Sequence, residues 1–140
     1  MSIEIIGINS LLNKLNRLSN IKTKEAVDSV AKVVETTIKS GASWAPNASQ
    51  YIGRCDVREY ENGSYFVEIG LKNDNAPFEL WKNVYFHNYG YNLKYYGHPT
   101  NTFVNTHIMW FNNSVNNVGE PTIEKLKSNI RRQIKACLED

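Results

Sequence analysis

The feature that most limits the possible folds is the stretch from Arg54 to Lys72, in which two alternating runs of apolar and polar residues flank Glu61-Asn62-Gly63-Ser64. Asn and Gly both accept the positive φ angles that a type I′ turn requires, so Asn-Gly between such runs predicts a β-hairpin. The candidates for its buried face are Val57, Tyr65, Val67 and Ile69. The chain therefore contains antiparallel β-structure, although most of the remaining pattern is helical.

Apolar residues at helical spacing predict helices on both sides of this hairpin. One short amphipathic helix is predicted from Asn9 to Leu18, and a longer one from Thr23 to about Ser40. After the hairpin, the helical period runs from Asn101 to Val118, where Gly119 is expected to end the segment. Pro121, which suits a helix start, is expected to open a last amphipathic helix that reaches Leu138.

The order of these elements predicts an α+β fold. A short strand is expected at residues 2–7, residues 41–55 are expected to form a loop, and residues 76–91 fit a strand or one or two helical turns equally well. The expected architecture has N-terminal helices, a small antiparallel sheet with a hairpin at Asn62-Gly63, and two C-terminal helices. With 140 residues and 16.0 kDa, the chain is expected to form a single domain over residues 1–140.

Charge and cysteine usage exclude several classes of protein. The net charge of +2 is below the strong excess of a protein that grips many phosphates, so tight nucleic-acid binding is not indicated. Cys55 and Cys137 lie far apart and have no metal-ligand spacing, so we expect reduced thiols, no metal site and no cofactor. The N-terminal residues lack the pattern of a signal peptide, and no segment is apolar enough for a membrane span; we expect a soluble, unexported protein.

The stretch YFHNYGYNLKYYGHP, from Tyr85 to Pro99, is the most unusual part of the sequence and allows three interpretations. His87 and His98 could serve as acid and base in phosphodiester cleavage, but the chain has no GxSxG, P-loop, HExxH or paired-carboxylate motif. Tyrosines beside Lys94 could stack on nucleic-acid bases, although their spacing does not place them on one face of a strand. Aromatic residues are also enriched in protein–protein contacts, which makes a packed structural segment an equally good interpretation.

Several landmarks in one order resemble the tail-completion, or head–tail joining, proteins of tailed phages. They are GINSLLNKLNRL near the N-terminus, Ala45-Pro46, Gly53-Arg54, the VEIG strand from Val67 to Gly70, VYFHNYG, and His98-Pro99 followed by Phe103. The resemblance covers nearly the whole chain. The sequence departs from the family pattern in a longer spacer between Pro46 and Gly53 and in the loss of an acidic residue around His87-Asn88.

The resemblance implies a non-enzymatic protein that forms a ring, six-fold in the particle, in the neck of a virion assembled in the bacterial cytoplasm. One surface would face the tail tube or tail terminator and another the head-side connector or stopper, while DNA passes through the lumen without sequence-specific binding. Two segments are expected to make the contacts, through Trp44, Pro46, Tyr51, Arg54, Tyr85, Tyr89, Tyr91, Tyr95, Tyr96 and Phe103. The alternative is a small nucleic-acid-binding protein or a ribonuclease-like toxin that uses residues 85–99.

Overall fold

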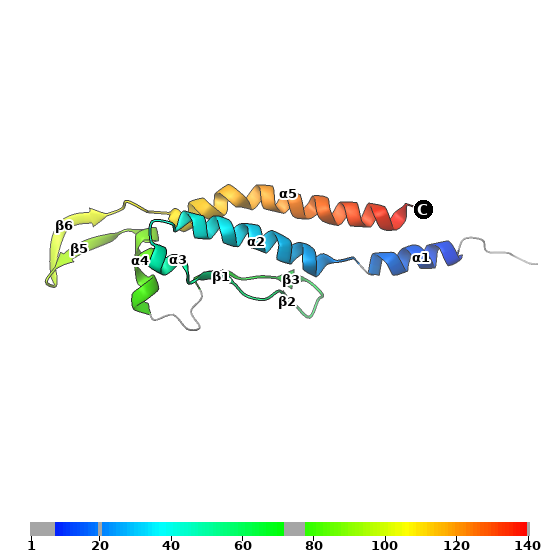
Figure 1. Ribbon diagram of the computed structural model, residues 1–140, viewed down its shortest axis with the longest axis horizontal. Coiled ribbons are helices and arrows are strands. Elements are labelled where there is room, and N and C mark those ends of the chain that lie inside the picture. The colour runs from blue at the N-terminus through cyan, green and yellow to red at the C-terminus, as the bar shows by residue number, and fades with distance from the viewer. Residues whose placement is uncertain (1–7, 20, 72–77, 140) are drawn as a thin grey trace, which may run out of the picture.

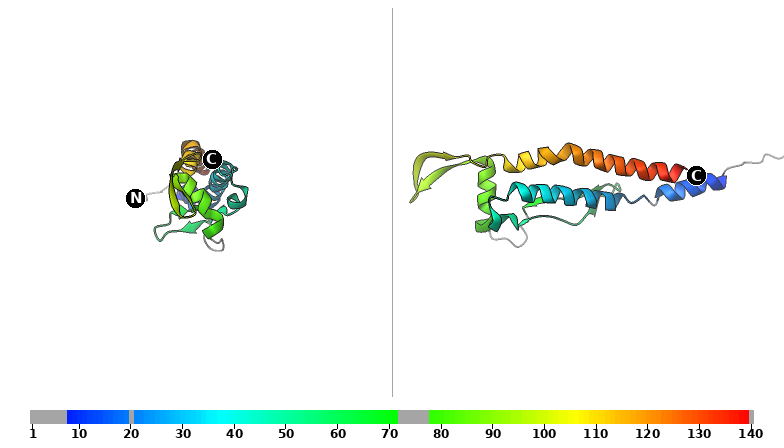
Figure 2. Two further views of the ribbon diagram at one scale, coloured as in Figure 1. Left: turned by 90° about the vertical axis from the view of Figure 1, so that its left-hand side faces the viewer. Right: turned by 45° about the horizontal axis from the view of Figure 1, so that its top comes forward.

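Two helices that run side by side form the long axis of the molecule (Figure 1). The computed structural model describes residues 8–19, 21–71 and 78–139. Helix α2 (Thr23–Gly41) packs along helix α5 (Trp110–Leu138), and α1 (Ile8–Ser19) continues the axis beyond the start of α2 (Figure 2). The two predicted N-terminal helices are thus confirmed. The strand expected at residues 2–7 lies outside the described residues.

Within the described residues, the β-structure consists of three separate antiparallel pairs. Strand β1 (Ile52–Arg54) pairs with β4 (Ile69–Leu71), β2 (Arg58–Glu59) with β3 (Tyr65–Phe66), and β5 (Tyr91–Tyr95) with β6 (His98–Val104). The second pair is the hairpin predicted from the Asn-Gly turn, and the Asn62 side chain accepts a hydrogen bond from the Ser64 N–H at 3.0 Å. The predicted type I′ turn is wrong, because only Gly63, with a φ of 81°, has a positive φ; the Gly63 N–H donates to the Tyr60 carbonyl oxygen at 2.9 Å.

Helix α2 is the central layer. Helix α5 covers one side of it, while β1, β3 and β4 pack against another side (Figure 1). The buried core lies at one end of α2, where the short helices α3 (Pro46–Ser49) and α4 (Phe78–Tyr89) also meet; its members are Ile38, Ala42, Ala48, Ile52, Val84 and Trp110. A Cβ atom on Gly41 would lie 2.1 Å from the Ser114 hydroxyl oxygen, so the missing side chain lets α2 and α5 approach closely there.

The prediction of two C-terminal helices is wrong, because α5 is one continuous helix that includes Gly119 and Pro121. Proline removes one backbone hydrogen bond and crowds the carbonyl four residues earlier, so its presence favours a break or a bend. Val118 and Thr122 on either side of this point are both buried, whereas Pro121 is exposed. Packing on the inner side of the helix therefore holds the two halves together, and α5 is bowed rather than broken (Figure 2).

Two other segments also differ from the sequence prediction, and one that was left open between strand and helix is now assigned. The helix expected from Asn101 starts only at Trp110, because residues 98–104 pair with β5 instead. The expected loop at residues 41–55 contains α3 and β1. The ambiguous segment before Gly90 is the helix α4.

Candidate functional site: the aromatic end of the molecule

The β5–β6 hairpin projects as an arm from one end of the helical body, at the opposite end from α1 (Figures 1 and 2). We call residues 91–104 the arm. Of these, only Tyr91, Thr100 and Val104 are half-buried, and the others are exposed. A tight turn closes the tip, where Tyr96 and Gly97 have φ angles of 47° and 82°. The predicted aromatic contact segment is thus a helix followed by a projecting two-stranded ribbon.

The arm exposes large rings that have little to pack against in the monomer. Tyr95 is 70% exposed, Tyr96 87% and Phe103 51%, and the first two contact each other edge to face. An isolated two-stranded ribbon is at best marginally stable in water, and exposed aromatic patches mark interaction sites. The arm therefore has the properties of a segment that is completed by a partner.

Gly90 fixes where the arm leaves the body. Its φ of 74° is one that residues with a side chain rarely adopt, and an added Cβ would lie 2.5 Å from Phe103 Cζ and 3.1 Å from the Val104 carbonyl oxygen. Only glycine fits this position without displacing β6. The direction in which the arm leaves the body therefore requires glycine at position 90, the residue that ends VYFHNYG.

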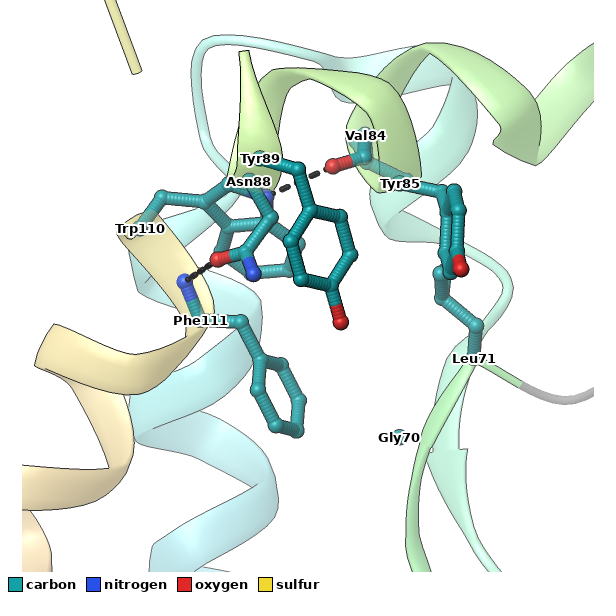
Figure 3. Close-up of a pocket in the computed structure, with 8 residues that line it drawn as sticks. All are labelled: Gly70, Leu71, Val84, Tyr85, Asn88, Tyr89, Trp110 and Phe111. Carbon is teal, nitrogen blue, oxygen red and sulfur yellow. Dashed lines mark hydrogen bonds between the residues drawn. The ribbon is translucent and has the colours of Figure 1, made fainter. Parts of the chain in front are cut away.

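Asn88 joins α4 to the start of α5. The first N–H groups of a helix have no partner inside the helix, and here the N-cap residue Met109 supplies none from its side chain. The Asn88 side-chain oxygen accepts from the Phe111 N–H at 3.0 Å (Figure 3). Its NH₂ group donates to the Asn112 side-chain oxygen at 3.1 Å, and its main-chain oxygen accepts from the Met109 N–H at 2.8 Å. Asn88 is only 5% exposed, so this contact is a buried cap supplied by another helix.

Trp110 also joins α4 to α5, within the buried core. Its indole N–H donates to the Val84 carbonyl oxygen at 2.7 Å, and both residues are buried (Figure 3). Together with Tyr89 and Phe111 they line a mostly apolar, open pocket of about 180 Å³, to which β4 contributes Gly70 and Leu71. The exposed rings of Tyr85 and Tyr89 stand at this end of α4.

Four rings form a cluster beneath the arm. Trp44 stacks on His107 with ring centroids 4.0 Å apart, and His87 contacts the edges of Trp44 at 4.9 Å, Tyr91 at 5.2 Å and His107 at 5.6 Å. Burial of the imidazole, and secondarily the nearby His107, lowers the pKa of His87 below its usual 6.5. The Nδ1 atom of His87 is buried and has no hydrogen-bond partner among the described residues.

This lowered pKa predicts a pH-dependent stability. The unfolded chain takes up a proton on His87 more readily than the folded one, so the free energy of unfolding should fall as pH drops through 6.5 towards the folded-state pKa. The urea midpoint should therefore decrease between about pH 7.5 and about pH 5. His87→Phe should flatten this dependence, whereas His98→Phe, on the exposed arm, should retain it. An equal slope in His87→Phe would contradict the assignment.

The remaining predicted contact residues have different surroundings. Arg54 is tied inside the subunit, with an ion pair to Asp28 and another to Glu35 at 3.0 Å. Chiefly the hydrogen bond from Lys32, and in addition the charge of Arg54, lower the pKa of Asp28. Pro46 is exposed at the start of α3, and Tyr51 is half-buried just before β1.

The structure does not bring together the two histidines of the catalytic interpretation. His98 pairs with Tyr95 at the distal end of the arm, whereas His87 lies in α4 beside His107, which the catalytic interpretation did not include. The role of Asn88 was also missed, since an asparagine between aromatic residues carries no capping signal for a helix that starts 22 positions later.

Within residues 8–19, 21–71 and 78–139, no three His, Cys, Asp or Glu side chains gather as a metal ion would require. The helices of the same ranges include none with the length and apolarity of a bilayer span. A scan against protein-family models and searches of curated proteins and of solved structures give no match to this chain.

Proposed function

We propose that the protein is a non-enzymatic neck component of a phage or phage-tail-like particle, which forms a ring at the head–tail junction and completes the tail. The order of sequence landmarks supports this proposal, from the leucine-rich first helix to His98-Pro99 and Phe103. In a ring of such subunits, the neighbouring copy, the tail side and the connector side each need a separate surface.

The observation that carries the proposal is the projecting arm with its exposed rings. At the opposite end of the molecule, α1 also exposes apolar side chains: Leu11 is 59% exposed, Leu12 51% and Leu15 50%. A subunit with unpartnered apolar groups at both ends of a long body is suited to a chain of contacts in an assembly, since each end meets a different neighbour.

The exposed tyrosines also favour a second candidate, single-stranded nucleic-acid binding through base stacking. Lys94 is the only formally charged residue in the arm, residues 91–104. Such binding usually combines stacking rings with a positively charged groove along the backbone, and the arm supplies only the rings. Protein contact is therefore the better use of this surface. A strong, salt-dependent affinity of the purified protein for single strands would favour the second candidate.

The arm gives the test of the proposed function. In a strain that lacks the gene, the variant Tyr95→Ser/Tyr96→Asn should leave heads and tails unjoined, or tails without a finished upper end, because the contact energy of the two rings is lost. Asparagine is chosen at position 96 because it tolerates the positive φ. Electron microscopy of the particles and the infectious titre are the measurements.

The matched control is Asn92→Ser/Asn101→Ser, which changes exposed polar residues of the same arm and should restore joined particles. Circular dichroism of both purified variants checks that the body is folded. Fully joined, infectious particles in the strain without the gene would reject the neck role.

A further inference from the structure

The segment around the β2–β3 hairpin carries a cluster of exposed negative charge. Residues 56–68 contain four carboxylates and one arginine, a net charge of −3, and all five side chains are exposed. We call this the acidic hairpin face; its charged members are Asp56, Arg58, Glu59, Glu61 and Glu68. Tyr60, 56% exposed and stacked on Phe66 with centroids 4.2 Å apart, adds an aromatic surface to it.

The C-terminal half of α5 carries the opposite charge. Residues 123–138 contain five basic residues and one glutamate, a net charge of +4. The five basic side chains are all exposed, and we call them the basic helix face: Lys125, Lys127, Arg131, Arg132 and Lys135. The half-buried Leu126, Ile130 and Gln133 belong to the other side of the helix. Exposed Ile123, at 53%, and Leu138, at 48%, supply apolar surface in the same segment.

Ion pairs within the subunit leave most of this charge unbalanced. On the acidic side, Arg58 approaches Glu68 only at 3.9 Å, and Asp56, Glu59 and Glu61 have no ion pair among the described residues. On the basic side, Lys127 pairs with Glu124 and Lys135 with Glu139, both exposed, while the other three cations have no ion pair within residues 8–19, 21–71 and 78–139. Exposed pairs of this kind contribute little and exchange readily for others.

The two faces cannot meet within one molecule. Helix α2 lies between them, with α5 on one side and β3 on another (Figure 1). Both nonetheless lie in the same part of the long axis, because β3 packs on α2, and Arg132 and Gln133 of α5 lie beside Lys22 and Glu25 at the start of α2. A sideways neighbour in the same orientation would therefore bring its basic helix face to the acidic hairpin face.

We propose that the occupant of the acidic hairpin face is the basic helix face of a second copy of this chain. The match of −3 with +4, each beside exposed apolar side chains, is the observation that selects a copy over another partner. The contact joins two different patches, so it is heterologous and closes into a ring when the rotation between copies allows. It extends the proposed function by naming the contact between subunits, but self-association can be measured without any particle.

Charge substitution provides the test. Lys127→Glu/Arg131→Glu lowers the net charge of the basic face from +4 to 0, and Glu59→Lys/Glu61→Lys changes that of the acidic face from −3 to +1. Each variant alone should self-associate at least about tenfold more weakly than the wild type in low salt. An equal mixture should form one-to-one pairs that grow no further, since each pair retains one matched contact. The variant with all four changes should self-associate as weakly as either single-face variant, because its two faces carry net charges of 0 and +1 and no longer attract each other. Sedimentation velocity and native mass spectrometry measure the species.

The control Lys24→Glu/Lys94→Glu alters the net charge by the same amount as the basic-face variant but lies outside both faces, and should behave as the wild type. Raising the salt from about 0.05 M to about 0.5 M should weaken the wild-type contact, because the charges become screened. Absence of self-association at low salt and millimolar protein, or mixtures that remain monomeric, would overturn the proposal. The proposal would also be overturned if Lys127→Glu/Arg131→Glu abolished binding to DNA and left self-association unchanged. If the strain that lacks the gene still made joined particles while the purified chain self-associated as expected, only the proposed function would be overturned.

Discussion

Ile38→Asp is expected to leave the protein unfolded at room temperature. Ile38 is 1% exposed and packs in the core with Ala42, Ile52, Val84 and Trp110. A carboxylate at this position would lie among these apolar side chains, a cost of several kcal/mol against a total stability of about 5–15 kcal/mol for a domain. Circular dichroism should show lost helicity, and gel filtration an expanded chain.

Val33→Asp is the matched control, because it places the same group on the same helix. Val33 is 38% exposed, so its carboxylate stays in water and should change the free energy of unfolding by less than about 1 kcal/mol. A folded Ile38→Asp variant would mean that the side of α2 that faces the core has been assigned incorrectly.

Trp110→Ala should have the next largest effect, a loss of about 3–5 kcal/mol, since it removes the largest buried side chain at the junction of α4 and α5. Trp110→Phe separates two contributions: it keeps most of the packing and removes the hydrogen bond to the Val84 carbonyl oxygen. That change alone should cost about 1–3 kcal/mol. Urea denaturation followed by circular dichroism gives both values.

Trp81→Phe is the control for the loss of the hydrogen bond from Trp110 to Val84. The indole nitrogen of Trp81 is buried and has no partner among the described residues, so its removal takes away no bond. A loss for Trp81→Phe equal to that for Trp110→Phe would show that ring size, rather than the bond to Val84, determines the effect.

The elements that sequence analysis predicted well depend on local chemistry. The Asn62-Gly63 turn contains its own signal, and the structure has this hairpin, although only Gly63 adopts the positive φ that was expected of both residues. The apolar stripe of α2 likewise repeats within one segment. Both predictions need no knowledge of what the rest of the chain does.

The errors arise where contacts with a distant segment determine the secondary structure. Gly119 and Pro121 usually end helices, but burial of Val118 and Thr122 keeps α5 continuous. Residues 101–104 belong to the segment predicted as helical, yet they pair with β5 to form the arm. Neither the packing of α5 nor the partner of β6 can be read from a short window of sequence, and the same holds for the position of His107 beside His87.

The cap that Asn88 supplies to α5 has a consequence for the order of folding. A side chain from α4 satisfies the first turn of α5, so that turn gains its buried cap only once α4 has formed and docked. The intervening residues include the whole arm, and closing this loop costs entropy before the cap is gained. We therefore expect α5 to grow from its middle, where it packs on α2, and its first turn to form late, together with the base of the arm.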